Sequence, residues 1–346
     1  MRARMPCGSP ASASIFPPGF SPGAACRWPR ARPESSLFEG ETRALWQART
    51  IIHNGHAIPF EDARIHPLAI GVAFGIAVFE GLRAYRHPTT GAFTVFRLEE
   101  HLDRLEQGMK VLRFADPPSR DVLRAAVLEV IRLNAPDDDA YLRLQVQIEG
   151  MGMMATTGPV GWIAAALPRE RSTKFATGLA AQVSSWTRLP DNAMPPRIKA
   201  SANYHAARLA TLQAKADGYD SAILLTTRGK VSEAAAACLF LVRDGVLATP
   251  HRGSDILESI TRQTVMALAR ELSIPVEERE VDRSELYIAD EVFLCGTGQE
   301  LVPVTSVDRL PVGAGVPGAV TKRLQAAYEA VVRGTTDAHP EWRTAV

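Results

Sequence analysis

Residues 93–148 decide the fold class, and they read FTVFRLEEHLDRLEQGMKVLRFADPPSRDVLRAAVLEVIRLNAPDDDAYLRLQVQI. The short run Phe93–Phe96 is aromatic and β-branched, which predicts a strand. Apolar residues then recur at helical spacing in two blocks, and Ser119 stands where the second helix would begin, as a capping residue does. Tyr141–Ile148 alternates apolar and polar residues as a half-buried strand does. This mixture of strands and helices predicts an α+β fold.

The chain before residue 93 contains a folded part and a very different leader. Thr50–Pro59 reads TIIHNGHAIP, and the Asn54–Gly55 pair at its centre predicts a β-hairpin. Residues 1–33 hold seven prolines, five arginines and no acid, without helical or strand periodicity. Such a segment buries too little apolar surface to offset its ordering entropy. We therefore expect residues 1–45 to be a disordered or spurious extension.

Beyond residue 148 the sequence predicts a second domain. The polar residues Arg169–Thr173 interrupt the pattern and suggest a linker over 169–178. We expect a small α+β domain over 46–168, a larger α/β domain with the active site over 179–335, and a tail over 336–346. Strands are predicted at 179–185, 221–226, 239–242 and 291–294, and helices at 204–216, 260–272 and 317–332.

Composition excludes several classes of protein. The chain has 346 residues, 46% hydrophobic and 22% charged, with a net charge of +1. It therefore lacks the basic field of a nucleic-acid-binding protein, and no apolar run reaches the roughly 18–20 residues that span a bilayer. The four cysteines form no C-x-x-C pair, which predicts neither a metal site nor a disulfide framework and favours a cytoplasmic protein.

Two residues stand out as candidates for chemistry. Lys199 lies in the stretch RIKASANY among small neighbours that leave room for a ligand, although a lone lysine is ordinarily a solvated surface residue. Glu233 is followed by four alanines, and an unpaired acid in such apolar surroundings is costly to bury. The alternative for Glu233 is an acid on a helix surface.

Three other segments suggest an anion site. Ser259–Arg262 opens a predicted helix, where free N–H groups attract anions, although a plain N-cap serine is the simpler interpretation. Cys295–Gly298 ends a predicted strand with two glycines around a threonine, which allows either close backbone approach to a ligand or a tight turn. Arg104 lies one helical turn from Glu100, so the alternative for it is a surface ion pair.

In combination, these residues resemble the class IV pyridoxal-phosphate-dependent aminotransferases, in particular the branched-chain amino acid aminotransferase group. The resemblance covers about residues 51–333, and it rests on the order and spacing of several segments. These segments are 78–83 (VFEGLR), 97–105 (RLEEHLDRL), 140–143 (AYLR), 184–186 (SSW), Lys199 with Asn203–Tyr204, Ser232–Glu233, 260–262 (ITR) and 295–297 (CGT).

The resemblance implies the two-domain class IV fold (fold type IV) and the cofactor pyridoxal 5′-phosphate. Lys199 would be the catalytic residue, binding the cofactor covalently and moving the substrate proton. Tyr204 would contact the phenolic oxygen of the cofactor and Glu233 its ring nitrogen. The other residues implied to hold the cofactor are Arg104, Leu257, Ile260, Thr261 and Thr297. Those implied to bind substrate are Phe79, Tyr141, Arg143, Thr297 and Gly298.

The implied reaction is transamination between branched-chain L-amino acids and 2-oxoglutarate, in a homodimer or a higher homo-oligomer such as a dimer of dimers or a hexamer. The partners are small-molecule amino acids and 2-oxo acids, with no nucleic acid or membrane. This chain departs from the family pattern at Phe74, Leu144, Arg169 and Cys238, where Tyr, Pro, aromatic residues and Asn are usual. A specialised biosynthetic, D-amino acid or (R)-amine aminotransferase, an aminodeoxychorismate lyase and a non-catalytic relative therefore stay open.

Overall fold

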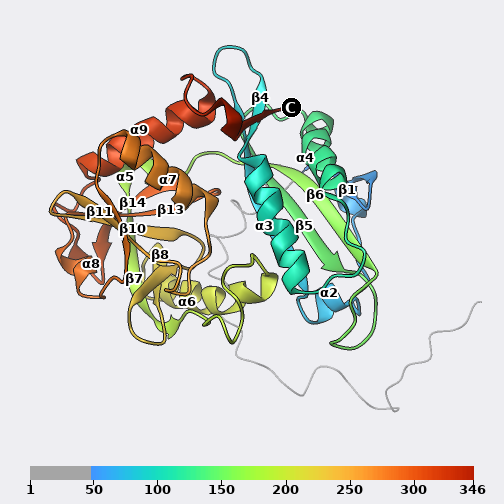
Figure 1. Ribbon diagram of the computed structural model, residues 1–346, viewed down its shortest axis with the longest axis horizontal. Coiled ribbons are helices and arrows are strands. Elements are labelled where there is room, and N and C mark those ends of the chain that lie inside the picture. The colour runs from blue at the N-terminus through green and yellow to red at the C-terminus, as the bar shows by residue number, and fades with distance from the viewer. Residues whose placement is uncertain (1–47) are drawn as a thin grey trace, which may run out of the picture. The chain divides into compact units, whose positions relative to one another are not determined.

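The predicted hairpin and helices of the first half are confirmed by the computed structural model, which describes residues 48–346; the predicted extension over 1–45 lies outside the described residues. Asn54 and Gly55 both adopt positive φ, 50° and 85°, as a tight hairpin turn requires. Ser119 caps the second helix, because its side chain accepts a hydrogen bond from the amide of Val122. These residues belong to one compact unit with two β-sheets (Figure 1).

The first sheet has seven strands, and each neighbouring pair is antiparallel. Its β3–β5 pair sets Gly81 opposite Arg143 and Phe79 opposite Gln145. The strand order is β16 (Arg343–Ala345), β4 (Phe93–Phe96), β3 (Ala77–Arg86), β5 (Ala140–Ile148), β6 (Val160–Pro168), β1 (Thr50–His53) and β2 (His56–Pro59).

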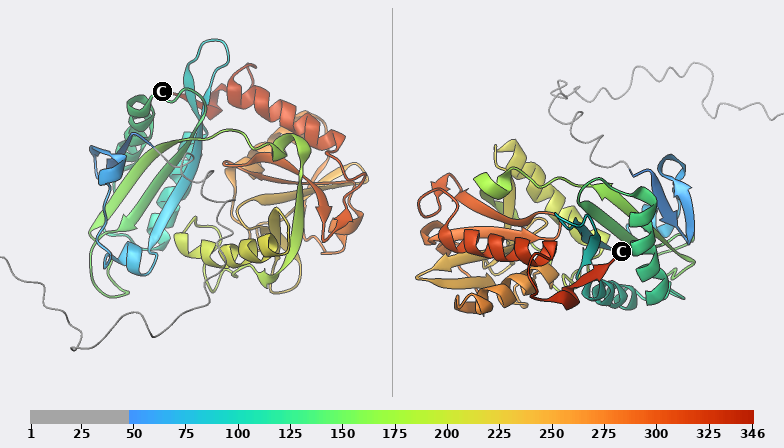
Figure 2. Two further views of the ribbon diagram at one scale, coloured as in Figure 1. Left: turned by 180° about the vertical axis from the view of Figure 1, so that it is seen from behind. Right: turned by 90° about the horizontal axis from the view of Figure 1, so that it is seen from above.

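Two long helices cover one face of this sheet, α3 (Leu98–Val111) and α4 (Arg120–Asn134) (Figure 1, Figure 2). Their apolar stripes meet the buried side chains of β3 and β5 in one core that includes Leu82, Leu102 and Leu144. The short elements α2 (Ile70–Ala73) and η2 (Phe60–Asp62) precede β3. One helix face and one sheet face thus bury the apolar positions that the spacing predicted.

The second sheet mixes parallel and antiparallel pairs. Strands β7 and β8 are parallel, whereas β10 and β13 are antiparallel with Cys238 opposite Cys295. The strand order is β12 (Val276–Arg279), β11 (Val246–Pro250), β10 (Cys238–Arg243), β13 (Glu291–Gly296), β14 (Glu300–Val307), β7 (Leu179–Thr187), β8 (Ser221–Leu225) and β9 (Val231–Ala234), with β15 (Leu310–Pro311) beside β14.

The long helices pack on one face of the second sheet, and the other face lines a core that includes Val183, Ile223 and Leu294. Over β10 and β13, α7 (Ile260–Glu271) and α9 (Ala319–Arg333) form a core with Phe240 and Phe293, whose rings stack. Over β8, α6 (Tyr204–Ala216) packs small alanine side chains on that same face. The remaining short helices are α5 (Lys174–Thr177), α8 (Glu285–Ile288), η3 (Ser201–Asn203) and η4 (Pro340–Trp342).

The expected tail and the expected linker both contain regular secondary structure. Residues 336–346 were expected to form a tail, yet they contain η4 and β16, which adds to the first sheet beside β4. The expected linker 169–178 contains α5. The division into domains stays a prediction. Across residues 48–346, none of the helices combines the length and the apolar character needed to cross a membrane.

Candidate active site

Lys199 is held at the edge of the first sheet by backbone contacts. Its carbonyl accepts a hydrogen bond from the amide of Phe79 at 3.0 Å, and Ala200 bridges to Val78 of β3. The side chain of Asn203 donates to the carbonyls of Pro195 and Ile198 and so fixes the loop. The chain around Lys199 is therefore anchored at both ends, which restricts where its amine can lie.

The amine of Lys199 lies among aromatic rings. Its Nζ donates to the Tyr204 hydroxyl at 2.7 Å and stands 5.1 Å from the centroid of the Phe79 ring. The Arg143 guanidinium stacks on the same ring, with Cζ 3.5 Å from the centroid. Burial lowers the pKa of Arg143, although arginine stays protonated in proteins. Four predicted site residues thus form one cluster.

Arg104 is not the surface residue of the simpler interpretation. Its guanidinium forms two 2.7 Å hydrogen bonds with the buried carboxylate of Glu80, which His101 also contacts at 2.7 Å. Burial raises the pKa of Glu80, but Arg104 and His101 outweigh that effect and lower the pKa to about 2. The third contact of Arg104 is the carbonyl of Glu258, at 2.9 Å, so the arginine reaches the start of α7.

The N-terminus of α7 offers donors for an anion. Ser259 caps the helix by accepting from the amide of Arg262 at 3.2 Å. The amides of Ile260 and Thr261 are in buried residues and find no acceptor within residues 48–346. The hydroxyls of Thr261 and Thr297 lie 3.4 Å apart, beside these amides. Such orphan amides, with hydroxyls and a nearby arginine, fit a phosphate group.

Glu233 lies on strand β9, not on the helix of the alternative interpretation, and its carboxylate is almost fully buried. Arg188 approaches it at 2.5 Å, the amide of Leu257 donates at 3.2 Å, and the Cys238 thiol lies at 3.5 Å. A carboxylate has about four acceptor sites. One remains for a further donor, which fits a protonated ring nitrogen. Arg188, the charge partner, was not singled out in the sequence.

Tyr141 and Gly298 close another side of the cluster. A side chain at Gly298 would begin 3.8 Å from the Tyr141 ring. A side chain at Gly81 would collide with the Tyr141 hydroxyl, so this close approach requires glycine. Each predicted site residue other than Arg104 contacts, or is a chain neighbour of, another predicted one, and Arg104 contacts Glu258, which follows Leu257 in the chain. The roles of all these residues stay predictions.

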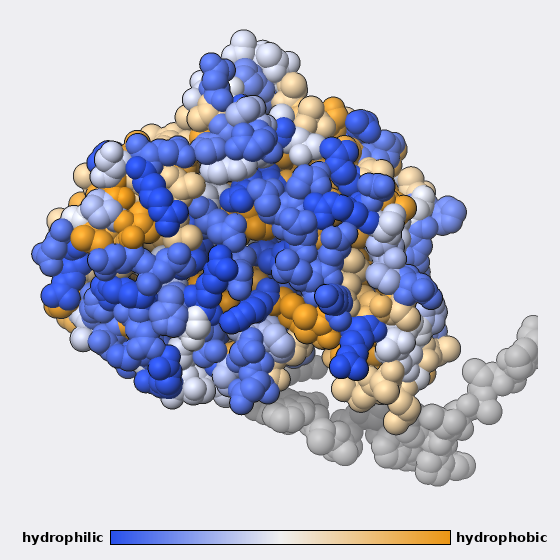
Figure 3. All heavy atoms as spheres, viewed as in Figure 1, coloured by the Kyte–Doolittle hydropathy of each residue, from blue (hydrophilic) through white to orange (hydrophobic). Residues whose placement is uncertain are grey.

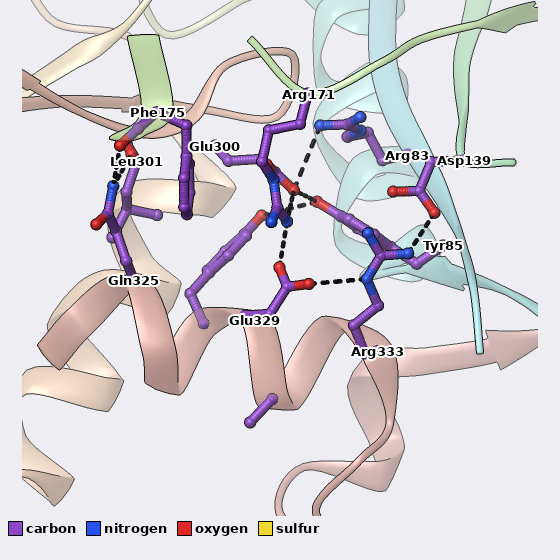
Figure 4. A network of polar contacts seen from close by, with 12 residues as sticks. Arg83, Tyr85, Asp139, Arg171, Phe175, Glu300, Leu301, Gln325, Glu329 and Arg333 are labelled. Carbon is purple, nitrogen blue, oxygen red and sulfur yellow. Dashed lines mark hydrogen bonds and ion pairs between the residues drawn. The ribbon is translucent and has the colours of Figure 1, made fainter. Parts of the chain in front are cut away.

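The segment between the sheets is tied to this region by charge (Figure 4). Arg171 donates to the buried carboxylate of Glu300 at 2.6 Å, and Arg83 of β3 approaches the same carboxylate at 3.3 Å. Arg83 also donates to the carbonyl of Arg169. Glu300 follows the turn that carries Thr297, so this network fixes both the connecting segment and the turn. Spacing alone gave no sign of these long-range pairs.

Comparisons with known proteins agree with this geometry. The family model for amino-transferase class IV matches residues 77–307. A branched-chain-amino-acid aminotransferase of Escherichia coli K12 is 39% identical, over 86% of this chain and 97% of that protein. The PLP-form crystal structure of a branched-chain amino acid aminotransferase from Thermobaculum terrenum is 40% identical, with a TM-score of 0.82 over 86% of this chain and 98% of the other. The branched-chain aminotransferase from Thermoproteus uzoniensis, crystallised with norvaline, gives 33% and 0.82, with 86% and 99% covered.

Proposed function

Because this chain belongs to the class IV aminotransferases, and within them to the branched-chain amino acid aminotransferase group, we propose that it transfers amino groups between branched-chain L-amino acids and 2-oxoglutarate. Pyridoxal 5′-phosphate, when bound, supplies an aldehyde for amines and a ring that draws electrons from the substrate Cα. The observation that carries the proposal is the Lys199 amine, 2.7 Å from the Tyr204 hydroxyl and 5.1 Å from the centroid of the Phe79 ring.

In this proposal Lys199 is the residue that binds the cofactor and moves a proton. With the cofactor bound, Lys199 Nζ would be the amine that holds its aldehyde, and the same Nζ would accept the proton of the substrate Cα. Tyr204 fixes the direction of the amine and donates to the cofactor's phenolic oxygen. The backbone contacts between Lys199 and β3 keep the amine in place through the reaction.

The remaining cofactor contacts follow from where the donors lie. The amides of Ile260 and Thr261 at the start of α7, with Arg104 and Thr297, would hold the phosphate. Glu233 would accept a hydrogen bond from the ring nitrogen. Leu257, whose amide contacts Glu233, packs against the ring.

Substrate recognition must serve two unlike side chains. Tyr141, Thr297 and the Gly298 backbone bind the α-carboxylate that both substrates share. Phe79 presents an apolar surface for a branched aliphatic group. Arg143, stacked on that same ring, binds the second carboxylate of glutamate or 2-oxoglutarate, because a guanidinium is well matched to a carboxylate.

The first experiment is a visible absorption scan of the purified protein with pyridoxal 5′-phosphate. We expect an absorption band of the bound cofactor that Lys199→Ala removes, because no other amine lies in the proposed position. Lys110→Ala, an exposed lysine on α3, serves as the control and keeps the band. A band that survives Lys199→Ala at full strength contradicts the assignment.

A panel of amino donors with 2-oxoglutarate, read by glutamate formation, separates the proposed reaction from the other class IV activities. We expect L-leucine, L-isoleucine and L-valine to react. Reaction with D-alanine or (R)-amines alone would show that the specificity is different. Release of pyruvate from aminodeoxychorismate, without glutamate formation, would indicate the lyase.

We further propose a cytoplasmic homodimer or a higher homo-oligomer, such as a dimer of dimers or a hexamer. Support comes from exposed apolar residues on two joined segments, because a contiguous patch of this kind marks an interface. Ala69 bridges to Met151, and Figure 3 shows hydrophobic atoms around α2 at its lower right. The exposed residues are Leu68, Val72, Phe74, Met151, Met153 and Met154.

Sedimentation velocity tests the assembly. Met153, with 78% of its surface exposed, lies in this patch, so Met153→Glu is expected to shift the protein toward a smaller species. Val316→Glu changes another apolar residue, 62% exposed and outside the patch, and should leave the assembly intact. A wild-type protein that sediments as a monomer at all concentrations refutes the proposal.

A further inference from the structure

One face of strand β5 carries a continuous row of polar side chains. Arg143, Gln145 and Gln147 alternate along the strand, and Glu149 follows directly after its end. Residues two apart on a strand point to the same side of the sheet. The row therefore starts at the guanidinium beside Phe79 and runs away from the cluster along one face. We call these four residues the β5 polar row.

The hydrogen bonds of the β5 polar row all run in one direction. Arg143 Nη2 donates to Gln145 Oε1 at 2.8 Å, Gln145 Nε2 to Gln147 Oε1 at 2.5 Å, and Gln147 Nε2 to Glu149 Oε1 at 3.1 Å. An ionised carboxylate only accepts. Glu149 therefore forces the Gln147 amide to point its nitrogen outward and its oxygen inward, and Gln147 imposes the same orientation on Gln145.

The outer end of the row is itself anchored. Glu149 contacts His53 Nε2 at 2.8 Å and accepts from Asn54 Nδ2 at 3.0 Å, both in the β1–β2 hairpin. Burial raises the pKa of Glu149, but hydrogen bonds from His53, Gln147 and Asn54 outweigh it and hold the pKa below its ordinary value. The carboxyl thus stays ionised near neutral pH, and the direction of the row is fixed.

The row lies where apolar side chains would be easier to bury. Gln147 is only 2% exposed, and Gln145 stands opposite Phe79 across the β3–β5 pair. A buried amide that loses a partner costs free energy, so each member depends on the next. At the inner end this order reaches Arg143, whose Nη2 is tied to Gln145 while the guanidinium stays stacked on the Phe79 ring and is also hydrogen-bonded to Tyr141.

We propose that Gln145 and Gln147 are positioning residues for Arg143 and set the enzyme's affinity for its dicarboxylate substrate. This rests on the proposed function, in which Arg143 binds the second carboxylate. The row prepares the guanidinium before the substrate arrives, so binding loses less side-chain entropy. The branched aliphatic substrate does not contact the guanidinium through a second carboxylate, so its affinity should not depend on Gln145 and Gln147.

The test measures binding of two unreactive analogues to the cofactor-loaded enzyme by calorimetry. Glutarate has the second carboxylate, and 4-methylpentanoate has a branched aliphatic end. In Gln147→Leu we expect the dissociation constant of glutarate to rise about tenfold, as for a lost hydrogen bond to a charged group. That of 4-methylpentanoate should stay within about twofold. The KM for 2-oxoglutarate should rise in parallel, with the kcat for leucine unchanged.

Two controls separate the possible outcomes. Gln182→Leu removes a comparable side-chain hydrogen bond, to Asp217, on β7 of the other sheet, and should change neither constant. Arg143→Met should abolish the preference for glutarate. If Arg143→Met leaves glutarate binding intact, the proposed role of Arg143 fails. If Arg143→Met weakens glutarate binding but Gln147→Leu does not, the positioning role of the row is refuted.

A second variant keeps the test decisive if Gln147→Leu does not fold. Glu149→Gln lies at the half-buried outer end and replaces the carboxylate with an amide that imposes no direction on Gln147. We expect glutarate to bind about threefold more weakly, because the row can then reverse. Unchanged glutarate affinity in this variant would overturn the proposal.

Discussion

At the scale of single residues, Glu80 shows how a buried charge organises the site. Its carboxylate has no exposed surface and is shared by Arg104 and His101. Burial lowers the pKa of His101 despite the acid beside it, so Arg104 is the cation that balances Glu80. Arg104 is therefore held by two hydrogen bonds on one edge while it reaches toward α7 with another.

The pKa of Glu80 predicts a pH dependence of stability. A carboxyl whose folded-state pKa is depressed stabilises the fold above its ordinary pKa of 4.5 and loses that effect as the pH falls to about 2. This shift corresponds to about 3 kcal/mol. Glu80→Gln leaves Arg104 buried without its counter-ion, which should cost about 3–5 kcal/mol near neutral pH. Urea unfolding of the cofactor-free protein at a series of pH values measures both.

If Glu80 titrates in this way, the stability difference between wild type and Glu80→Gln becomes smaller as the pH falls. The gap in unfolding free energy between wild type and Glu80→Gln should shrink by about 3 kcal/mol between pH 4.5 and 2. Glu129→Gln, at an exposed ion pair on α4, should cost less than about 1 kcal/mol at any pH. A gap that stays constant on acidification would show that Glu80 does not titrate as inferred.

At the scale of elements, helices α4 and α7 both begin with a serine cap, but only the start of α7 is proposed to bind the cofactor phosphate. Ser119 caps α4 and Ser259 caps α7, each accepting from the amide three residues on. Replacing either with alanine should lower the unfolding free energy by about 1 kcal/mol. Only Ser259→Ala should also weaken binding of pyridoxal 5′-phosphate to the cofactor-free protein, by about fivefold, because it loosens the phosphate-binding turn.

Equilibrium titration of the cofactor-free variants with pyridoxal 5′-phosphate checks this prediction, and Ser119→Ala is the matched control. Equal cofactor affinity in the two variants would mean that the start of α7 does not hold the phosphate. A shared loss of stability without a difference in affinity would assign Ser259 to the fold alone.

The sequence predicts elements best where local chemistry decides them. Asn54–Gly55 specifies its hairpin, and the Ser119 and Ser259 caps mark helix starts, because each signal acts within a few residues. The partners of Glu233 and Arg104 were not predictable in this way. Glu80 lies 24 residues from Arg104 along the chain, and Arg188 is also distant from Glu233 in the sequence although the two side chains are in contact. Only the packing of helices and strands in the folded protein brings such charges together.

Resemblance to a family proposes the site residues but does not show what is particular to this chain. Cys238 stands where Asn is usual, and its thiol contacts Glu233 and the Leu257 carbonyl. Burial and the nearby Glu233 raise the pKa of Cys238 to about 12, so it stays a neutral donor. Arg171, in the place of an aromatic residue, forms an ion pair. At both departures the side chain of this protein makes polar contacts: the Cys238 thiol with Glu233 and the Leu257 carbonyl, and the Arg171 guanidinium with Glu300.

At the scale of the whole molecule, one charged network joins both sheets. Glu300 is 1% exposed and has a left-handed backbone, φ 59°, at the start of β14. It meets Arg83 and Tyr85 of the first sheet and Arg171 of the connecting segment, and Arg171 also pairs with Glu329 of α9. Because these groups are largely buried, they couple the turn before β14 to the segment 169–178 (Figure 4).

Arg171→Met should loosen this connection without unfolding either sheet. Glu300 keeps Arg83 and Tyr85 as partners, and the Arg171 side chain is 30% exposed in its ion pairs with Glu300 and Glu329, so the expected loss of stability is about 2 kcal/mol. The segment 169–178 should then be cleaved faster by trypsin after Arg169 and Lys174, and mass spectrometry locates the cuts. Arg283→Met removes an exposed contact with Asp308 and should leave cleavage unchanged. Equal protection of the segment in both variants would place the restraint elsewhere, in the Arg83 contact with the Arg169 carbonyl.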